Sequence, residues 1–336
     1  MEEVFLSTIT PVYKGEAFLN DLVRELAAVR TSFENEGLPV RLIEAIFVDD
    51  GSVDDSFVVL TRLQADYDWV KVIALSRNFG QHPATVAGIL HSSGDWVATL
   101  DEDLQHHPKF LRQLLVGAVV QRQDVMYAAP EGGTHGSYFR DLSSRLFKAG
   151  VARLTGNPHV RKFNSFRMMR GSIARAAAAV STRTTYLDVA LCWFTNRVGA
   201  LPLPLRDVRY IFQRSSGYKL GGLLRHARRL LLSSEIKLLR LGAGIGVLAL
   251  VVSVVLSVLT LLVKLEFPQM IGVPGWTSLF LAILFFGGLM CLLLGITLEY
   301  MATIFMHLMG RPTFFVIDRS KDRIILQFLK RVEGQA

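Results

Sequence analysis

The chain has 336 residues, of which 51% are hydrophobic and 20% are charged, with a formal net charge of +8 at pH 7. This hydrophobic share is high for a soluble protein and predicts membrane-spanning segments. The two cysteines, Cys192 and Cys291, belong to no Cys-x-x-Cys or Cys/His set, so the sequence predicts neither a disulfide scaffold nor a zinc site.

In chain order, the sequence begins with an acidic stretch, MEEVFLST, which lacks an apolar run and predicts no cleavable signal peptide. From there to about residue 124, strand-like and helix-like segments alternate. The strand-like segments are VFLSTIT, LIEAIFV, VKVIAL, DWVATL and DVMYAA, and the helical ones span residues 18–33, 54–65, 82–91 and 108–122. This alternation predicts an α/β, Rossmann-like fold with a mostly parallel, doubly wound sheet. Ligands bind such sheets beyond the carboxyl ends of the strands.

The next region, up to about residue 216, is less regular. PEGGTHGS has the composition of a flexible loop. A helix carrying four basic residues is predicted over residues 139–154, and an alanine-rich helix over 172–180. We assign residues 1–216 to one cytoplasmic domain.

Residues 217–240 predict a basic amphipathic helix, with leucines on one face and Arg225, Arg228 and Arg229 on another. Such a helix rests on an anionic membrane surface, although a helix packed on the domain would show the same pattern. Residues 242–263 and 276–298 carry no charge and are long enough to span a bilayer, so we expect a two-helix hairpin over 241–299. Basic flanks on both sides place both termini in the cytoplasm, including a juxtamembrane helix and tail over 300–336.

Acidic residues cluster at two predicted strand ends. VDDGS follows the second strand, where a carboxylate can accept hydrogen bonds from a nucleobase or ribose; a turn with a helix cap would look alike. DEDLQ follows DWVATL, and its alternating acids, Asp101 and Asp103, can share one Mg²⁺ or Mn²⁺ that neutralises a leaving diphosphate. We interpret His106 and His107 as partly exposed loop histidines.

Together the motifs TPVYKGEAFL, FVDDGSVDDS, LSRNFGQHPATVAG, LDEDLQHHP, NSFRMM and LGITLEYMATIFMHLMGRPTFFV resemble family 2 glycosyltransferases. The order is similar to the polyprenyl-phosphate branch, that of dolichol-phosphate mannose synthase and the two-span bacterial undecaprenyl-phosphate sugar transferases. The resemblance covers nearly the whole chain. It implies a GT-A-type domain, a UDP- or GDP-linked sugar donor, a polyprenyl phosphate acceptor, residence in a bacterial inner membrane and a homotetramer.

The resemblance also implies roles for individual residues. The residues expected to bind the nucleotide sugar are Pro11, Tyr13, Glu16, Val48, Asp50, Asp101 and Gln105. Asp101, Asp103 and Gln105 are expected to hold the metal and the sugar diphosphate, Arg140 and Ser144 the lipid phosphate, and Arg214 the donor diphosphate. Solvated helix or loop charges are the alternative for the two arginines.

Three positions depart from the family pattern. Lys14 and Gly15 stand where the family has Asn-Glu, so Glu16 is expected to substitute; Pro130 and Glu131 replace basic residues; and Ser165 replaces an acid.

A lipid phosphate is already an anion at neutral pH, so its attack on a sugar needs no general base. We therefore expect a single in-line displacement with inversion, in which Arg140 and Arg214 offset the repulsion between two anions. The alternatives are a polysaccharide synthase of the same family, which normally has Gln-x-x-Arg-Trp where this chain has QRSSG, and a non-enzymatic membrane module. Nucleic-acid binding is disfavoured because the basic residues cluster at the membrane flanks without a nucleic-acid motif.

Overall fold

The computed structural model describes residues 3–130, 159, 162–181, 186–205, 237–267, 275–308 and 321–333. The chain forms two compact units. The first comprises Met1–Ser234 together with Pro312–Ala336, and the second comprises Glu235–Arg311.

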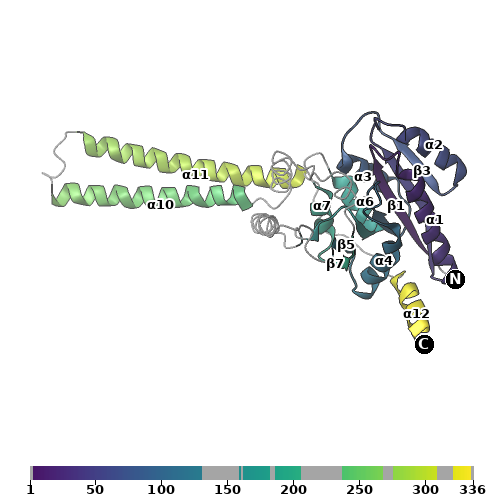
Figure 1. Ribbon diagram of the computed structural model, residues 1–336. Helices are drawn as coiled ribbons and strands as arrows, with labels where there is room; N and C mark the ends of the chain where they lie inside the picture. Colours follow the sequence, from purple (N-terminus) through teal and green to yellow (C-terminus); the bar gives the residue numbers. More distant parts are fainter. Residues whose placement is uncertain are drawn as a thin grey trace. The chain divides into compact units, whose positions relative to one another are not determined.

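The first unit is built on a seven-stranded sheet with the strand order β3-β2-β1-β4-β6-β5-β7 (Figure 1). Its strands are β1 (Val4–Val12), β2 (Val40–Asp49), β3 (Val70–Ala74), β4 (Trp96–Thr99), β5 (Val125–Pro130), β6 (Arg167–Arg170) and β7 (Val198–Leu203). Neighbouring strands run parallel except at β6, which is antiparallel to both β4 and β5. The predicted α/β fold with a mostly parallel sheet is confirmed.

Helices cover both faces of this sheet. The helices are α1 (Leu19–Asn35), α2 (Ser56–Asp66), α3 (Gln81–Leu90), α4 (Leu111–Val120), α6 (Gly171–Val180) and α7 (Leu187–Phe194), with a 3-10 turn, η1, at Pro108–Phe110. Apolar residues of α1, α2 and α4 join one core cluster with Trp96, and those of α3, α6 and α7 join another with Val97. Consecutive strand residues point to opposite faces, so each strand feeds both clusters.

The predicted helices over 18–33, 54–65, 82–91 and 172–180 match α1, α2, α3 and α6 closely. The helix predicted over 108–122 is divided, because Pro108 opens a 3-10 turn before α4 begins. The segment 139–154 lies outside the described residues.

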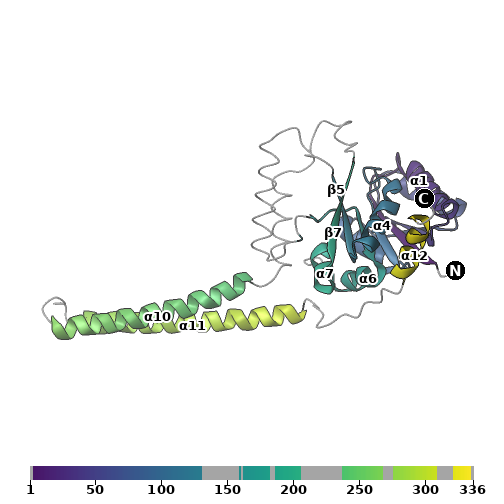
Figure 2. The same ribbon diagram turned by 90° about the horizontal axis from the view of Figure 1, so that it is seen from below.

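A further helix, α12 (Asp322–Glu333), packs on the first unit beside α4, as both views show (Figures 1 and 2). Its Ile325 is fully buried in the core cluster that α1 and α4 share. Arg170 on β6 donates to Asp322 at 2.7 Å, and Lys321 lies 3.3 Å from the Asp95 carboxylate. Part of the segment expected to be a juxtamembrane tail therefore belongs to the sheet domain.

The second unit is a hairpin of two long helices, α10 (Lys237–Glu266) and α11 (Trp276–Leu308) (Figures 1 and 2). Their segments Gly246–Glu266 and Trp276–Met301 are long and apolar enough to cross a membrane, and their most apolar windows are only 6% and 11% buried. Apolar side chains thus face outward, unlike those of a soluble core helix. Small residues allow close packing: a Cβ on Gly246 would lie 2.4 Å from the Cys291 carbonyl oxygen. The predicted amphipathic helix over 217–240 lies mostly outside the described residues.

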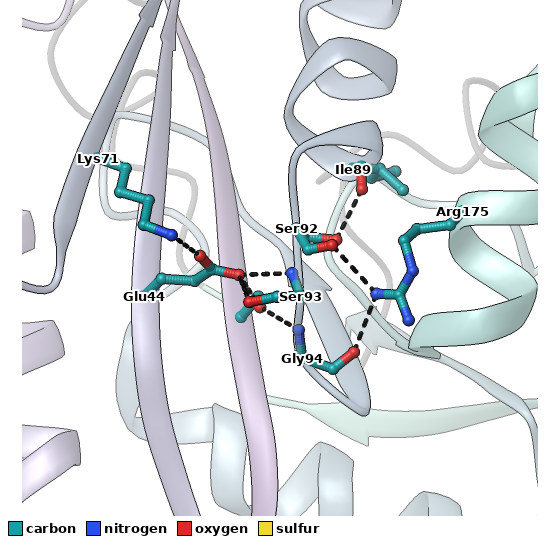
Figure 3. Close-up of polar contacts among 8 residues, drawn as sticks. Glu44, Lys71, Ile89, Ser92, Ser93, Gly94 and Arg175 are labelled. Atoms are coloured by element: carbon teal, nitrogen blue, oxygen red, sulfur yellow. Dashed lines mark hydrogen bonds and ion pairs between the residues drawn. The ribbon is translucent and has the colours of Figure 1, made fainter.

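At the amino end of the sheet, Glu44 forms a closed polar network (Figure 3). The carboxylate is 1% exposed and accepts hydrogen bonds from Ser7 Oγ at 2.7 Å, from the Ser93 amide at 2.7 Å and from Ser93 Oγ at 2.8 Å, and it pairs with Lys71. Burial alone would raise the pKa of Glu44, but the hydrogen bonds from Lys71, Ser7 and Ser93 outweigh it and hold the pKa below its usual value.

The same network fixes the turn between α3 and β4 (Figure 3). Ser7 Oγ accepts a hydrogen bond from the Gly94 amide at 2.9 Å, and Arg175 on α6 donates to the carbonyl oxygens of Ser92 and Gly94 at 3.3 and 3.0 Å. Strands β1 and β2 and helix α6 are therefore all tied to this turn, at the end opposite to the predicted ligand site.

Candidate active site

The acidic motifs meet at the carboxyl edge of the sheet, as parallel strands require. Strands β1, β2 and β4 are adjacent, and they end at Val12, Asp49 and Thr99. The loops that begin at Tyr13, Asp50 and Asp101 therefore lie side by side.

Asp101 is held by two neighbouring elements while part of it stays accessible. Gln81, at the start of α3, donates to Oδ1 at 2.7 Å, and Ser165, just before β6, donates its hydroxyl to Oδ2 at 3.1 Å. The Asp101 side chain is 24% exposed. Ser165 stands where an acid occurs in the family, and its hydroxyl supports Asp101 without adding a charge.

His106 supports Asp101 through a hydrogen bond to its backbone. Its Nδ1 accepts a hydrogen bond from the Asp101 amide at 3.2 Å, and its ring stacks on Phe166 with centroids 5.0 Å apart. Burial lowers the pKa of His106, and this outweighs the opposite effect of Asp101 and Asp103. The interpretation of His106 as a partly exposed loop residue is wrong, because only 6% of it is exposed; His107 is half-buried.

The rest of DEDLQ forms a strained turn. Leu104 has a φ of +60°, a left-handed conformation that costs free energy for a side chain of this kind. Asp103 is 4% exposed, and its Oδ1 accepts a hydrogen bond from the Gln105 amide at 3.3 Å. Strained backbone of this kind concentrates at functional sites. Here the turn places Asp103 and Gln105 close to the end of β4.

Glu102, between the two aspartates, has a different task. Its carboxylate accepts hydrogen bonds from the amides of Tyr13 at 2.9 Å and Lys14 at 3.3 Å, so it braces the loop after β1. A Cβ at Gly15 would lie 2.9 Å from Glu102 Oε2. The departure from the family pattern at Gly15 therefore makes room for this brace. The sequence analysis missed this role, although the exceptional glycine was a visible signal.

Asp50 braces the loop after β3 in the same way. Its two carboxylate oxygens accept hydrogen bonds from the amides of Phe79 at 2.7 Å and Gly80 at 2.8 Å, and the residue is 2% exposed. Gly51 has a φ of +64°, and a Cβ there would lie 2.8 Å from the Asn78 amide nitrogen. The VDDGS turn thus positions the loop after β3, which forms one wall of the site.

The other residues expected to bind the nucleotide differ in exposure. Tyr13 is 37% exposed and Pro11 is half-buried, so both reach the surface of the site. Val48 is fully buried and supports the sheet beneath them. Glu16 is exposed, and its carboxylate accepts a hydrogen bond from the Asp55 amide at 3.3 Å, which directs it toward the start of α2.

A pocket of about 230 Å³ extends from Asp101. Its near end is formed by Pro11, Phe79, Gln81 and Ser165, and its far end by Arg167, Tyr186 and Asp188. The helices α3 and α7 supply its walls through Gln81 and Asp188, and β4 and β6 supply its floor.

The far end carries a buried charge pair that the sequence analysis did not identify. Arg167 pairs with Asp188, and the Tyr127 hydroxyl donates to the same carboxylate oxygen at 2.6 Å. Burial and the neighbouring Asp188 carboxylate raise the pKa of Tyr127 well above its usual value. Burial would lower the pKa of Arg167, but the neighbouring Asp188 carboxylate more than offsets this and raises it.

The oxygen donors at the end of β4 suit a hard divalent cation. Asp101 and Asp103 supply carboxylates and Gln105 supplies an amide oxygen, the ligand types that Mg²⁺ and Mn²⁺ prefer. Among the described residues, no three His, Cys, Asp or Glu side chains form a ready-made metal cluster. This donor set fits an ion that takes one or two carboxylates and completes its shell with water and substrate phosphates.

Three predicted residues, Arg140, Ser144 and Arg214, lie outside the described residues, as does Glu131. Their expected roles stay predictions.

Comparison with protein families gives a single description for the sheet domain. The profile of glycosyl transferase family 2 matches residues 7–177, just over half of the chain. The matched segment includes every strand from β1 to β6 and all of DEDLQ. With the strand order above, it confirms the expected GT-A-type fold.

Similar proteins cover more of the chain. The undecaprenyl-phosphate 4-deoxy-4-formamido-L-arabinose transferase of Pseudomonas paraeruginosa is 30% identical over 314 residues, 93% of this chain and 89% of that protein. The transferase of the same name from Sodalis glossinidius is 28% identical over 93% of this chain and 92% of its own. At this coverage the similarity extends into the apolar helices.

Solved structures are more distant. Glucosyl-3-phosphoglycerate synthase from Mycobacterium tuberculosis, crystallised with Mn²⁺, UDP and glucosyl-3-phosphoglycerate, is 16% identical. The similarity has a TM-score of 0.45 and covers 68% of this chain and 77% of that one.

Proposed function

The chain belongs to glycosyl transferase family 2, and on that premise we propose that it transfers one sugar from a nucleotide sugar to a polyprenyl phosphate. Undecaprenyl phosphate is the expected acceptor. The observation that carries the proposal is the similarity to undecaprenyl-phosphate sugar transferases over 93% of the chain, sheet domain and apolar helices together. The enzyme is a glycosyltransferase; the donor, the acceptor and the mechanism are the proposed parts.

The carboxyl edge of the sheet supplies the donor site in this proposal. The nucleotide lies against Pro11, Tyr13 and the loops that Glu102 and Asp50 brace, while Asp101 faces the diphosphate. Asp101, Asp103 and Gln105 would hold Mg²⁺ or Mn²⁺, and the bound ion would supply positive charge for the departing diphosphate.

The reaction is a single displacement at the anomeric carbon. An oxygen of the lipid phosphate forms the new bond, the bond to the donor diphosphate breaks, and the nucleoside diphosphate leaves with the electron pair, so the anomeric configuration inverts. A phosphate anion has no proton to lose, and the protein's task is to align two anions. The hydrogen bonds from Gln81 and Ser165 keep Asp101 fixed for that purpose.

The two long apolar helices support the proposed membrane arrangement. We propose that α10 and α11 span the bacterial inner membrane. Both termini and the sheet domain, which includes residues 1–216, would then lie in the cytoplasm. Residues 217–240 would rest on the membrane surface as an amphipathic helix. The acceptor phosphate would then lie at headgroup height, within reach of Arg140 and Ser144. A homotetramer is a separate proposal, tested by light scattering on the purified protein.

The test is a transfer assay with the full-length protein in lipid nanodiscs. Undecaprenyl phosphate is supplied with a panel of radiolabelled UDP- and GDP-sugars, with Mg²⁺ or Mn²⁺, and label is counted in the organic phase. We expect label from one donor, its loss with EDTA and its loss when undecaprenol replaces undecaprenyl phosphate. Label that enters a water-soluble polymer would favour a polysaccharide synthase, and no label from any donor would contradict the proposal.

A further inference from the structure

The far end of the pocket beside Asp101 carries a second set of polar groups. The pocket measures about 230 Å³, below the roughly 300–1,000 Å³ of pockets for drug-sized ligands, so it has room for one small ring. Asp101 lines this pocket together with Asp188 and Arg167. The pocket thus joins the residue expected to face the leaving group to a buried charge pair.

One donor in that pair has no hydrogen-bond acceptor in the part of the chain that the structure describes. Arg167 is 6% exposed, it lines the pocket, and its Nε is buried without a hydrogen-bond partner. An unsatisfied buried donor costs about 1–3 kcal/mol, and a ligand hydroxyl in this pocket would supply the missing acceptor.

Asp188 offers the complementary chemistry. The residue is 2% exposed, and Arg167 and the hydroxyl of Tyr127 both contact the same one of its oxygens, Oδ1. A carboxylate fixed in this way accepts hydrogen bonds from sugar hydroxyls at little further cost in side-chain entropy.

The charges at both ends decide the class of ligand. Asp101 and Asp188 line the pocket with carboxylates, and Arg167, which also lines it, is already paired with Asp188. The lining therefore has a net negative charge, which disfavours an added anion. The rings of His82 and Tyr186, 5.2 Å apart, add an apolar wall. A neutral ring with several hydroxyl groups matches this lining, and a phosphate or a carboxylate does not.

We propose that this pocket holds the transferred sugar of the donor, that Asp188 and Arg167 bind its hydroxyl groups, and that the enzyme therefore takes neutral sugars and rejects uronic acids. The inference rests on the proposed function, since it specifies the sugar class for the same site. It adds two substrate-binding residues: Arg167, which lies in the NSFRMM motif but had no assigned role, and Asp188, which lies outside the quoted motifs.

The test compares binding of free UDP and GDP with binding of their sugar derivatives, by calorimetry on the full-length protein without lipid. The sugars are glucose, galactose, N-acetylglucosamine and mannose as neutral probes and glucuronic acid as the acidic one. For wild type we expect a neutral sugar to strengthen binding over the free nucleotide, and glucuronate to weaken it. Asp188→Asn should lower affinity for that neutral donor at least tenfold, change free-nucleotide affinity less than twofold and reduce the discrimination against glucuronate.

The fold offers a matched control at the other end of β6. Asp124 is fully buried and pairs with Arg170 Nε at 3.2 Å, so Asp124→Asn breaks a similar pair away from the pocket. We expect it to lower the melting temperature without changing sugar affinity. If Asp188→Asn does not fold, Tyr186→Ala, which removes a half-buried wall of the pocket, should show the same selective loss.

Two results would overturn the inference: equal donor affinity in wild type and Asp188→Asn, or no neutral sugar that strengthens wild-type binding. Because no lipid is present, either result leaves the transfer to undecaprenyl phosphate standing. Failure of that transfer with intact sugar-selective binding would instead contradict the proposed acceptor.

Discussion

The amino and carboxyl ends of the strands, here called the amino and carboxyl edges of the sheet, use carboxylate side chains in opposite ways. At the amino edge, Glu44 is 1% exposed and four hydrogen bonds from three residues surround it. At the carboxyl edge, Asp101 is 24% exposed and borders a pocket. A carboxylate surrounded by donors holds the fold together, whereas one left partly open can bind a ligand.

The carboxyl edge itself contains both kinds of acid. Glu102 and Asp50 have their oxygens occupied by backbone amides of the loops after β1 and β3, so they shape the site. Asp101 and Asp188 face the pocket. Motif position alone does not separate these roles; whether the carboxylate lines the pocket does.

The largest expected effect comes from the carboxyl edge. Asp103→Asn keeps an acceptor for the Gln105 amide but removes the charge, so the fold should persist while sugar transfer falls about 10²–10³-fold, the size expected when one preorganised charge-stabilising group is lost. Transfer rate and melting temperature are measured on the same preparation. A variant that retains a tenth of the wild-type rate would exclude Asp103 from the charge-bearing set.

A smaller effect is expected from the loop brace. In Gly15→Ala the new Cβ would lie 2.9 Å from Glu102 Oε2 and 3.2 Å from Val12 Cγ1, so Glu102 must shift and its hydrogen bond to the Tyr13 amide weakens. We expect UDP or GDP affinity to fall about tenfold, which corresponds to about 1.4 kcal/mol. Gly37→Ala is the control. It places a Cβ in open space at a turn with positive φ, so it should strain the backbone without changing nucleotide affinity. Unchanged nucleotide affinity in Gly15→Ala would show that this brace does not shape the site.

At the amino edge, Glu44→Gln should lower the free energy of unfolding by about 1–3 kcal/mol at pH 7 and leave transfer unchanged. The pKa of Glu44 is held below its usual 4.5 in the folded protein, so its charge contributes stability above that pH and the contribution is lost as the pH falls through the folded value. Denaturant titrations of both proteins should therefore converge in acid. A gap that persists below the folded pKa would contradict this assignment.

The smallest effect is expected for Lys71→Met. The Lys71 side chain is 56% exposed, so water screens its pair with Glu44 and the loss should be under about 1 kcal/mol. A loss as large as that of Glu44→Gln would mean that Lys71, and not Ser7 and Ser93, holds the carboxylate.

Most of the sheet could be predicted because apolar four- to ten-residue strands alternate with amphipathic helices. Strand β6, with the sequence RMMR, could not, because its arginines are buried by partners distant in sequence: Asp188, Asp124 and Asp322. The basic Lys321 was interpreted as a charge flanking the apolar segments, yet it lies 3.3 Å from Asp95, which is distant in sequence.

In the candidate site, too, local patterns could be predicted and contacts between distant residues could not. Asp101 and Asp103 were found from their spacing after a buried strand, which is local information. The burial of His106 depends on Phe166, sixty residues later, and the charge pair at the end of the pocket joins three separate elements. Such contacts depend on tertiary structure and leave no periodic signal in the sequence.

The most direct test of the division between the two edges measures two variants side by side. Asp103→Asn and Glu44→Gln are assayed for sugar transfer to undecaprenyl phosphate and for melting temperature, each against wild type. The account predicts that Asp103→Asn loses transfer and keeps its melting temperature, while Glu44→Gln keeps transfer and melts lower. If both variants lose both properties together, or if Glu44→Gln alone loses transfer, the two edges do not have separate roles.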